Sequence, residues 1–304
     1  MAYRIVFIET DVTVRLKLNN MVLTRADGDI WIPLDDISMV VLDNLNVTLT
    51  ARILCSIAEH NISMVICNME HLPIGFYSSY DNYSRVSKNI GYQINKSSEF
   101  YDTIWKIIVE HKIRNQKEVL ELLGKSDLVQ QCLEQYISEI TEGDKTNREA
   151  HAAKLYFNEL MQCSFSRGNE DILLNSGLDY GYAIIRAFIA RMCVGYGLNT
   201  QLGIHHKNEY NRFNLVDDLI EPVRPFVDFY AFQLLDGEKY FKQEHRKKLV
   251  NILNHKVIYK NKKMFVGNMI EDYVMQYAML LAGKRQEICY PAIKSYLGEG
   301  DAEI

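Results

Sequence analysis

The hydrophobic period changes once along this chain of 304 residues, and that change limits the folds open to it. Before residue 80, apolar side chains alternate with polar ones, as at Val12, Val14, Leu16 and Leu18, which is the period of a half-buried strand. From Ser98 onward, apolar residues recur every three or four positions, which predicts helices. We therefore expect an α+β protein in which a strand-rich region precedes a larger helical one.

Three segments follow from this change of period. Short strands with one inserted helix are expected over residues 1–80, the arrangement of a small β-sandwich-like domain. Residues 81–97 are polar without a clear period and are interpreted as a linker. Residues 98–304 are expected to form an all-α domain apart from a short hairpin at Val257–Val266. In that domain Asn147 is a candidate helix cap, and the apolar Leu178–Tyr196 predicts a central buried helix.

Composition excludes several classes of protein. Hydrophobic residues make up 48% of the chain and charged residues 24%, which is ordinary for a globular protein. No uncharged apolar run reaches the roughly 18 residues of a membrane span, so no membrane association is expected. Glu9 precedes the point where the apolar core of a signal peptide could end, so a cytoplasmic location is expected. The cysteines form no C-x-x-C pair and are expected to be reduced thiols; they are Cys55, Cys67, Cys132, Cys163, Cys193 and Cys289.

Charge is unevenly distributed along the chain. Residues 1–79 carry nine acidic against five basic side chains, whereas residues 242–263 carry eight basic side chains against Glu244 alone. The formal net charge of −5 argues against a protein that coats nucleic acid over its whole surface, but it leaves room for a local basic site. The basic segment is either a solvated helix face and hairpin or a place where a polyanion binds.

Two short motifs carry residues suited to catalysis. Glu149 lies in the first turn of a predicted helix, where the helix dipole favours a carboxylate, so a purely structural acid is the alternative. His205 and His206 are adjacent, and neighbouring side chains of an extended segment point to opposite sides, so one of them at most is expected to serve a given site. A structural, hydrogen-bonded histidine is the alternative here.

A third motif gathers acidic residues before a proline-rich turn. Asp217 and Asp218 lie four and three residues before Glu221, spacings that share one face of a helix. Like charges repel there, so the cluster is stabilised either by solvent and Arg224 or by a cation. Carboxylates with one imidazole and no paired cysteines suit Mg²⁺ or Mn²⁺. Such an ion with open positions supports phosphodiester chemistry, and the basic segment adds a way to hold nucleic acid.

Four longer stretches give a specific resemblance. They are NREAHAAKLYFNEL at 147–160, LNSGLDYGYAIIRAFIARMCVGYGL at 174–198, QLGIHHKNEYNRFNLVDDLIEPVRPFVD at 201–228 and MVICNMEHLPIGF at 64–76. The chain resembles CRISPR-associated protein 1, the integrase of CRISPR spacer acquisition, and most of all its type II branch. The resemblance covers nearly the whole chain and implies an N-terminal β-sandwich domain joined to a larger helical domain that carries a metal site.

The resemblance also implies a set of site residues. One Mg²⁺ or Mn²⁺ would be held by Glu149, His206 and Glu221, which would also be the catalytic residues. His206 matches the ligand better than His205 and lies fifteen residues before Glu221. Asp218 and His205 would lie next to the ligands, where a carboxylate can orient a ligating imidazole.

The implied reaction is DNA integration by transesterification. The 3′-hydroxyl of a captured DNA fragment attacks a phosphodiester at the leader–repeat junction, and water in its place gives endonuclease activity, a hydrolase reaction. The implied partners are double-stranded DNA, both prespacer and CRISPR repeat, a dimer of CRISPR-associated protein 2, and other type II adaptation proteins in the bacterial cytoplasm. Family members act as homodimers, two per complex, and we expect residues 1–80 to form the dimer interface.

The expected DNA contacts are cations that would neutralise phosphate: Arg224, Lys247, Lys248, Lys262 and Lys263. Two other functions stay open at this point. The chain could be a DNA-bridging structural subunit with a non-catalytic metal site, or a hydrolase of small phosphate esters. Intact Glu149, His206 and Glu221 argue against the first, and the basic segment argues against the second.

Overall fold

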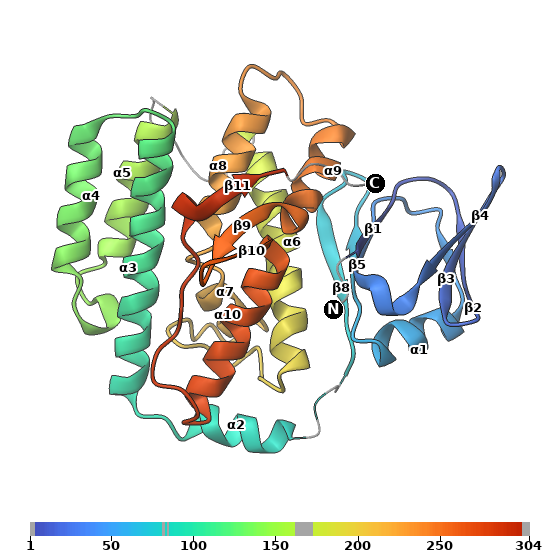
Figure 1. Ribbon diagram of the computed structural model, residues 1–304, viewed down its shortest axis with the longest axis horizontal. Helices are drawn as coiled ribbons and strands as arrows, with labels where there is room; N and C mark the ends of the chain where they lie inside the picture. The colour runs from blue at the N-terminus through green and yellow to red at the C-terminus, as the bar shows by residue number, and fades with distance from the viewer. Residues whose placement is uncertain (1–3, 81–82, 84, 162–172, 300–304) are drawn as a thin grey trace.

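The computed structural model of the protein describes residues 4–80, 83, 85–161 and 173–299. Cys163, counted among the thiols, lies outside these residues. The strands of the N-terminal region gather on one side of the molecule, helices α3, α4 and α5 lie on the other, and α6 runs between them (Figure 1). This is the expected order of a strand-rich region followed by a helical one.

Two four-stranded sheets and one helix form the N-terminal region. The first sheet, in the order β1-β5-β7-β8, comprises β1 (Arg4–Ile8), β5 (Ile37–Leu42), β7 (Ser63–Cys67) and β8 (Pro73–Tyr77). The second, in the order β4-β3-β2-β6, comprises β2 (Thr13–Lys17), β3 (Asn20–Arg25), β4 (Gly28–Pro33) and β6 (Thr48–Leu49). The short η1 (Leu34–Asp36) precedes β5, and α1 (Ala51–Glu59) follows β6.

The first sheet is buried on both faces, and every residue of its inner strand β5 is buried. Alternate side chains of a strand point to opposite faces. In β5, Val40 and Leu42 enter a core shared with the second sheet and α1, whereas Met39 and Val41 enter the core of the helical region. The N-terminal region is therefore a sandwich that uses its outer face to hold the helices.

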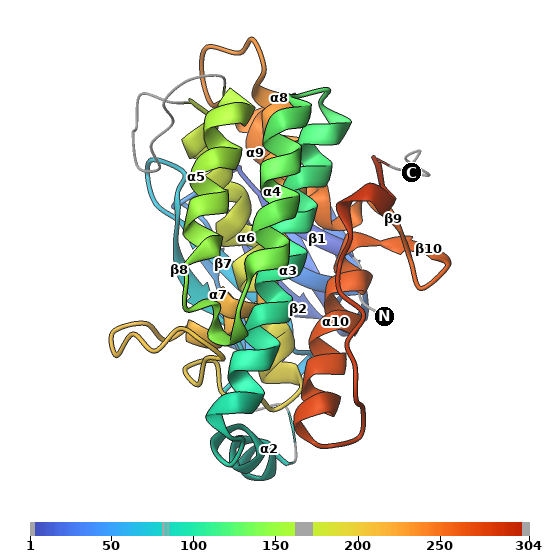
Figure 2. The ribbon, with the colours of Figure 1, turned by 90° about the vertical axis from the view of Figure 1, so that its left-hand side faces the viewer.

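The helical region contains the following elements in chain order: α2 (Val86–Ile94), α3 (Ser98–Leu122), α4 (Asp127–Glu139), η2 (Glu142–Asp144), α5 (Arg148–Met161), α6 (Leu173–Gly195), α7 (Asn214–Leu219), α8 (Arg224–Leu235), α9 (Gln243–Asn251), η3 (Ile252–Asn254), β9 (Lys256–Tyr259), β10 (Lys262–Phe265), α10 (Val266–Leu281), η4 (Ile293–Ser295) and β11 (Tyr296–Gly298). Figure 2 shows α3, α4 and α5 side by side on the face turned to the viewer, and the β9–β10 hairpin projecting at the right-hand edge. No helix in the described ranges is both long and apolar enough to span a membrane.

Three details differ from expectation. The region is not all-α, because β11 joins the expected β9–β10 hairpin in a three-stranded sheet. The segment 81–97, interpreted as a linker, contains α2. Its polar side chains bind the loop after α6: the Asn89 amide donates to the Tyr196 carbonyl (2.8 Å), and the Gln93 amide pairs with the backbone of Asn199.

The third difference concerns the start of α5. Asp144, rather than the expected Asn147, caps this helix, because its carboxylate accepts the backbone N–H groups of Arg148 and Glu149, both at 2.9 Å. Asp144 and Asn147 both have positive φ angles (47° and 53°), and this tight turn carries the aspartate back to the helix start. Helix α6 is the central buried helix, as predicted.

Candidate active site

The inner face of α3 forms the floor of the candidate site. Trp105 and Lys112 lie seven residues apart on this helix, which is two turns, and both are buried. The Lys112 ammonium contacts the carboxylates of both Glu149 and Glu221. It therefore joins two residues that are 72 positions apart in the chain and were both predicted from the sequence as ligands.

Further hydrogen bonds fix the positions of Glu149 and Glu221. The Asp144 carboxylate accepts the backbone N–H of Glu149 (2.9 Å), which fixes the first turn of α5. Glu221 lies in the turn between α7 and α8, and the Asn115 amide of α3 donates to the neighbouring Pro222 carbonyl (2.7 Å). The second Glu221 oxygen accepts the Nε of Arg224 at 2.9 Å. The geometry of the pair is thus set by α3, α5 and the α7–α8 turn together.

The charges around Lys112 shift the pKa values of Glu221, Lys112 and Arg224. Burial would raise the pKa of Glu221, but Arg224 and Lys112 overcome it and lower that pKa to about 2. Burial would lower the pKa of Lys112, but Glu221 and then Glu149 outweigh it and raise the pKa. Burial would lower the pKa of Arg224, but the charge of Glu221 outweighs it and raises the pKa. Glu221, Lys112 and Arg224 are consequently ionised at neutral pH.

Asp218 organises the histidine loop. This fully buried carboxylate accepts the backbone N–H groups of Ile204, His205 and His206 at 2.5, 3.0 and 3.2 Å. A Cβ on Gly203 would lie 2.3 Å from the His206 carbonyl oxygen and 2.9 Å from Asp218 Oδ2, so only glycine allows this close approach.

The same aspartate orients the His206 ring. Its Oδ1 lies 2.6 Å from His206 Nδ1. This hydrogen bond is the main reason why the pKa of His206 is raised, although burial opposes it and the charges of Asp218, Glu221 and Asp217 add to it. Because Nδ1 is engaged, Nε2 is the ring nitrogen left for a ligand, which is the arrangement expected when a carboxylate fixes a ligating imidazole.

The two adjacent histidines have different surroundings, as predicted. The His205 ring stacks on Trp105, with centroids 4.4 Å apart and an interplanar angle of 3°. The His206 ring meets the same indole edge-on, at 5.8 Å and 84°. Its side chain is 43% exposed and lines an open groove of about 500 Å³ with Lys207, Gln201, Asn208 and Asn214. His205 is the more exposed residue of the pair, but His206 is the one that lines this groove.

The predicted metal ligands form two groups in this structure. Glu149 and Glu221 meet at Lys112, and His206 meets Asp218. Over the described ranges, no group of three or more His, Cys, Asp or Glu side chains is placed to hold a metal ion. The donor set still fits a hard ion, because two carboxylates, the half-buried Glu149 and the buried Glu221, already direct one oxygen each at a single cation, the Lys112 ammonium.

The acidic cluster 217–221 divides among several partners. Helix α7 ends at Leu219, so Glu221 lies beyond it and the shared helix face expected for these acids does not form. Asp217 pairs with Arg186 through two contacts of 2.6 and 2.7 Å. Asp218 binds the histidine loop and Glu221 binds Lys112 and Arg224, so each acid has its own counter-charge or donors.

The candidate DNA contacts have unequal access to solvent. Arg224 lies beside Glu221 and over the Tyr182 ring, 4.5 Å from its centroid, so its guanidinium belongs to the site. Lys247 pairs with Glu9 at 2.7 Å. Lys248, Lys262 and Lys263 are exposed. The basic segment thus directs part of its charge at the acidic N-terminal region and the rest at solvent.

Several contributors to the site were not identified from the sequence: Lys112, Trp105, Asn115 and Asp144. Lys112 could have been found from the sequence, because it lies four residues after Ile108 and therefore on the buried face of α3. A lysine on a buried face indicates a buried carboxylate partner. Asn115 and Asp144 gave none, because their roles depend on which turns the fold brings next to them.

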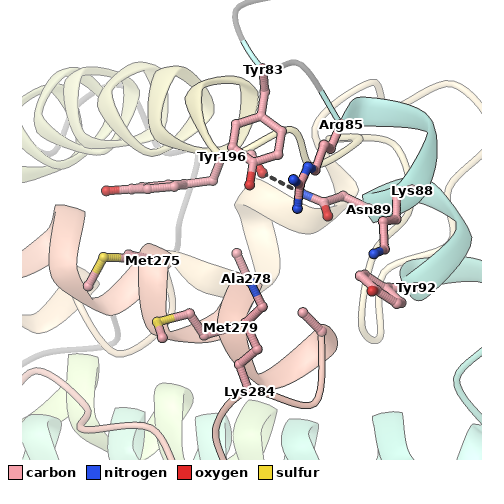
Figure 3. Close-up of a pocket in the computed structure, with 11 residues that line it drawn as sticks. Tyr83, Arg85, Lys88, Asn89, Tyr92, Tyr196, Met275, Ala278, Met279 and Lys284 are labelled. Carbon is pink, nitrogen blue, oxygen red and sulfur yellow. Dashed lines mark hydrogen bonds between the residues drawn. The ribbon is translucent and has the colours of Figure 1, made fainter.

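A separate pocket of about 310 Å³ lies between α2, the end of α6 and α10 (Figure 3). Arg85, Lys88 and Tyr92 enter it from α2 and the residue before it, and Met275 and Met279 from α10. No predicted site residue lines it, so this pocket is not part of the candidate site.

Comparison with known proteins shows the family to which this fold belongs. Residues 5–261 match the family described as CRISPR associated protein Cas1. The chain belongs to the Cas1 family. Its relatives include the CRISPR-associated endonuclease Cas1 of Neisseria meningitidis serogroup C (strain 8013), which is 35% identical over 236 residues, 78% of this chain and 77% of that protein.

Two solved structures share the Cas1 fold of this chain. A casposase bound to integration product superposes with a TM-score of 0.77 and 18% identity, covering 94% of this chain and 92% of that one. A Cas6-RT-Cas1–Cas2 complex superposes with a TM-score of 0.73 and 18% identity, covering 93% of this chain and 35% of that one. The N-terminal sandwich and helical region described above are therefore those of Cas1 proteins.

Proposed function

We propose that this Cas1 protein, a member of the type II branch, is a metal-dependent DNA integrase of CRISPR adaptation. It would insert spacer DNA into the repeat array by 3′-hydroxyl transesterification and cut DNA when water is the nucleophile. The observation that carries the proposal is the pair of carboxylates directed at one cation, the half-buried Glu149 and the buried Glu221. The endonuclease name of the Neisseria relative and the integration product in the casposase structure support the same reaction class.

Glu149, Glu221 and His206 would hold the Mg²⁺ or Mn²⁺. When bound, such an ion stabilises charge on a phosphodiester and lowers the pKa of an attacking hydroxyl. The protein's own residues position the ligands: Asp218 fixes the His206 ring, and Arg224 and Asn115 fix Glu221. The open groove next to His206, with Lys207 on its wall, would admit a DNA strand.

The proposed macromolecular partners are duplex DNA, both prespacer and repeat, and Cas2. One structural relative is a Cas1–Cas2 complex, which supports the second partner. Two dimers of this chain around a Cas2 dimer, with other type II adaptation proteins, complete the proposal.

The N-terminal sandwich is the proposed dimer interface. Its edge strands β4 and β8 carry exposed apolar side chains, including Trp31 at 41% and Ile74 at 72%. Met69 in the preceding turn is 84% exposed. Unpaired strand edges with apolar side chains favour association. A monomer at micromolar concentration in sedimentation velocity would overturn this part of the proposal.

Strand transfer tests the proposed reaction. A short duplex with 3′-hydroxyl ends is incubated with a repeat-bearing plasmid and Cas2, with and without Mn²⁺. Wild type should give joined product only with the ion, and E149A should give none while still binding duplex. E134A is the matched control, because Glu134 is an exposed acid that pairs with Lys117 away from the site. Full activity of E149A would favour the DNA-bridging structural subunit instead.

A further inference from the structure

We propose that Lys112 is a built-in stand-in for the divalent ion. Its ammonium holds Glu149 and Glu221 together in the metal-free protein, and it leaves them when the ion binds. The proposal rests on the metal-dependent function proposed above, and it assigns to Lys112 a positioning role that sets how tightly the ion is held.

The Lys112 ammonium lies where an ion shared by the two carboxylates would have to bind. The Lys112 side chain is 8% exposed and contacts one oxygen of each carboxylate. A Mg²⁺ or Mn²⁺ ion bound by the same oxygens would need them within about 2.0–2.6 Å. The ammonium and the ion would then compete for one small volume between the same two groups. Both cannot face these oxygens at once.

The net charge of the cluster also favours exchange of the ammonium for the ion. Three ion pairs link Glu149 to Lys112, Lys112 to Glu221 and Glu221 to Arg224, and the formal charges of these four side chains cancel. An ion added while Lys112 stays would leave an excess of two positive charges among groups that are mostly buried, which is strongly unfavourable. If the ammonium moves away, the excess falls to one, which a DNA phosphate can neutralise. Ion and phosphate are therefore expected to bind together.

The Lys112 side chain can move its ammonium out of the site. A lysine carries its charge on a flexible four-carbon stem, so the ammonium can move without movement of the helix backbone. Glu149, which is 28% exposed, marks the side of the cluster that opens to solvent, whereas Glu221 is 6% exposed. The ammonium can leave past Glu149 while Arg224 keeps Glu221 in place.

Mn²⁺ binding, measured by electron paramagnetic resonance, tests the proposal in wild type, K112M and K112R. K112M should bind Mn²⁺ at least about tenfold more tightly than wild type and gain more in melting temperature when Mn²⁺ is added, because no ammonium opposes the ion. K112R should bind more weakly, since a guanidinium fork grips two carboxylates better than an ammonium does. K117M on the exposed face of α3 is the matched control and should behave as wild type.

The outcomes separate this proposal from the proposed function. Equal affinity in wild type, K112M and K112R would overturn the role of Lys112 alone and leave the metal site intact. Absence of Mn²⁺ binding in both wild type and K112M would overturn the metal site and this proposal with it. If K112M does not fold, K112R still decides the matter: affinity equal to or above that of wild type would contradict the proposal.

Discussion

Two buried charge clusters in this Cas1 protein use similar residues for different ends. The interface cluster, Asp43 with Arg246 and His71, fastens α9 to the N-terminal sandwich. The active-site cluster, Lys112 with Glu149, Glu221 and Arg224, lies among the helices. In the first, one carboxylate meets the fork of an arginine through Nε and Nη2, both at 3.1 Å. In the second, two carboxylates share one lysine.

The difference lies in whether the cation can be exchanged. A planar guanidinium with two contacts to one carboxylate is a specific and rigid pair. An ammonium is a point charge that another cation can replace. The Asp43 side chain is fully buried, whereas the Glu149 side chain is 28% exposed and His206 lines an open groove. A buried arginine–carboxylate pair thus suits the attachment of one region to another. A lysine shared by two carboxylates near solvent suits a site that binds an ion.

The largest effect is expected at the two histidines of the active site. H206A should lower strand transfer about a thousandfold, because loss of a metal ligand removes several kcal/mol of transition-state stabilisation and each 1.4 kcal/mol is tenfold. H205A should stay within about tenfold of wild type, since that ring stacks on Trp105 rather than facing the groove. Initial rates of product formation measure both. The reverse order would move the ligand by one residue.

A large effect on stability, but not on chemistry, is expected at the interface cluster. R246M should lower the free energy of unfolding by about 3 kcal/mol, because it leaves the Asp43 carboxylate buried without its cation. Urea denaturation followed by circular dichroism measures this change. Strand transfer of the folded R246M protein should match wild type. A stable R246M protein with lost activity would remove the distinction between the two clusters.

The fold was predicted correctly where the burial of one face of a strand or helix determines the secondary structure. The alternation before residue 80 and the helical period after it are set by which side chains must leave water, as Val40 and Met39 illustrate on the two faces of β5. The segment 81–97 was wrongly interpreted, because Asn89 and Gln93 look like linker residues until the loop that they bind is known.

The candidate site was predictable only in part. The motifs drew attention to Glu149, His206 and Glu221, and the structure brings the two carboxylates together at Lys112. Their convergence with His206 on one ion stays a prediction. No spacing rule could reveal Asp144 as the cap of α5 or Lys112 as the shared cation, since both depend on contacts between segments far apart or on an unusual turn.

A moderate effect is expected from the exposed lysines of the basic segment. Changing Lys248, Lys262 and Lys263 to Ala should reduce the slope of log affinity against log salt on duplex DNA by roughly 0.9 per lost phosphate contact. Sequence preference should hardly change, because lysines lack the fork that reads guanine. Fluorescence anisotropy at several salt concentrations, with the Cas2 complex, gives the slope. An unchanged slope would mean that these lysines face solvent only.

The smallest effect is expected at the rim of the interface cluster. K247M removes an ion pair with Glu9 that is 2.7 Å long but 47% exposed at the lysine. Exposed pairs contribute about 0.2–1 kcal/mol, so the free energy of unfolding should fall by less than about 1 kcal/mol. The salt slope of DNA binding should stay close to that of wild type, because this lysine already has an acidic partner. A slope change as large as that at Lys248 would show that DNA displaces Glu9.

The active-site cluster, and not the interface cluster, is expected to be the metal site. Mn²⁺ titration monitored by electron paramagnetic resonance tests it on three proteins: wild type, E149Q and R246M. The account predicts one Mn²⁺ per chain for wild type and R246M, with at least about tenfold weaker binding to E149Q. Undiminished binding to E149Q, or loss of binding in R246M with the fold intact, would contradict it.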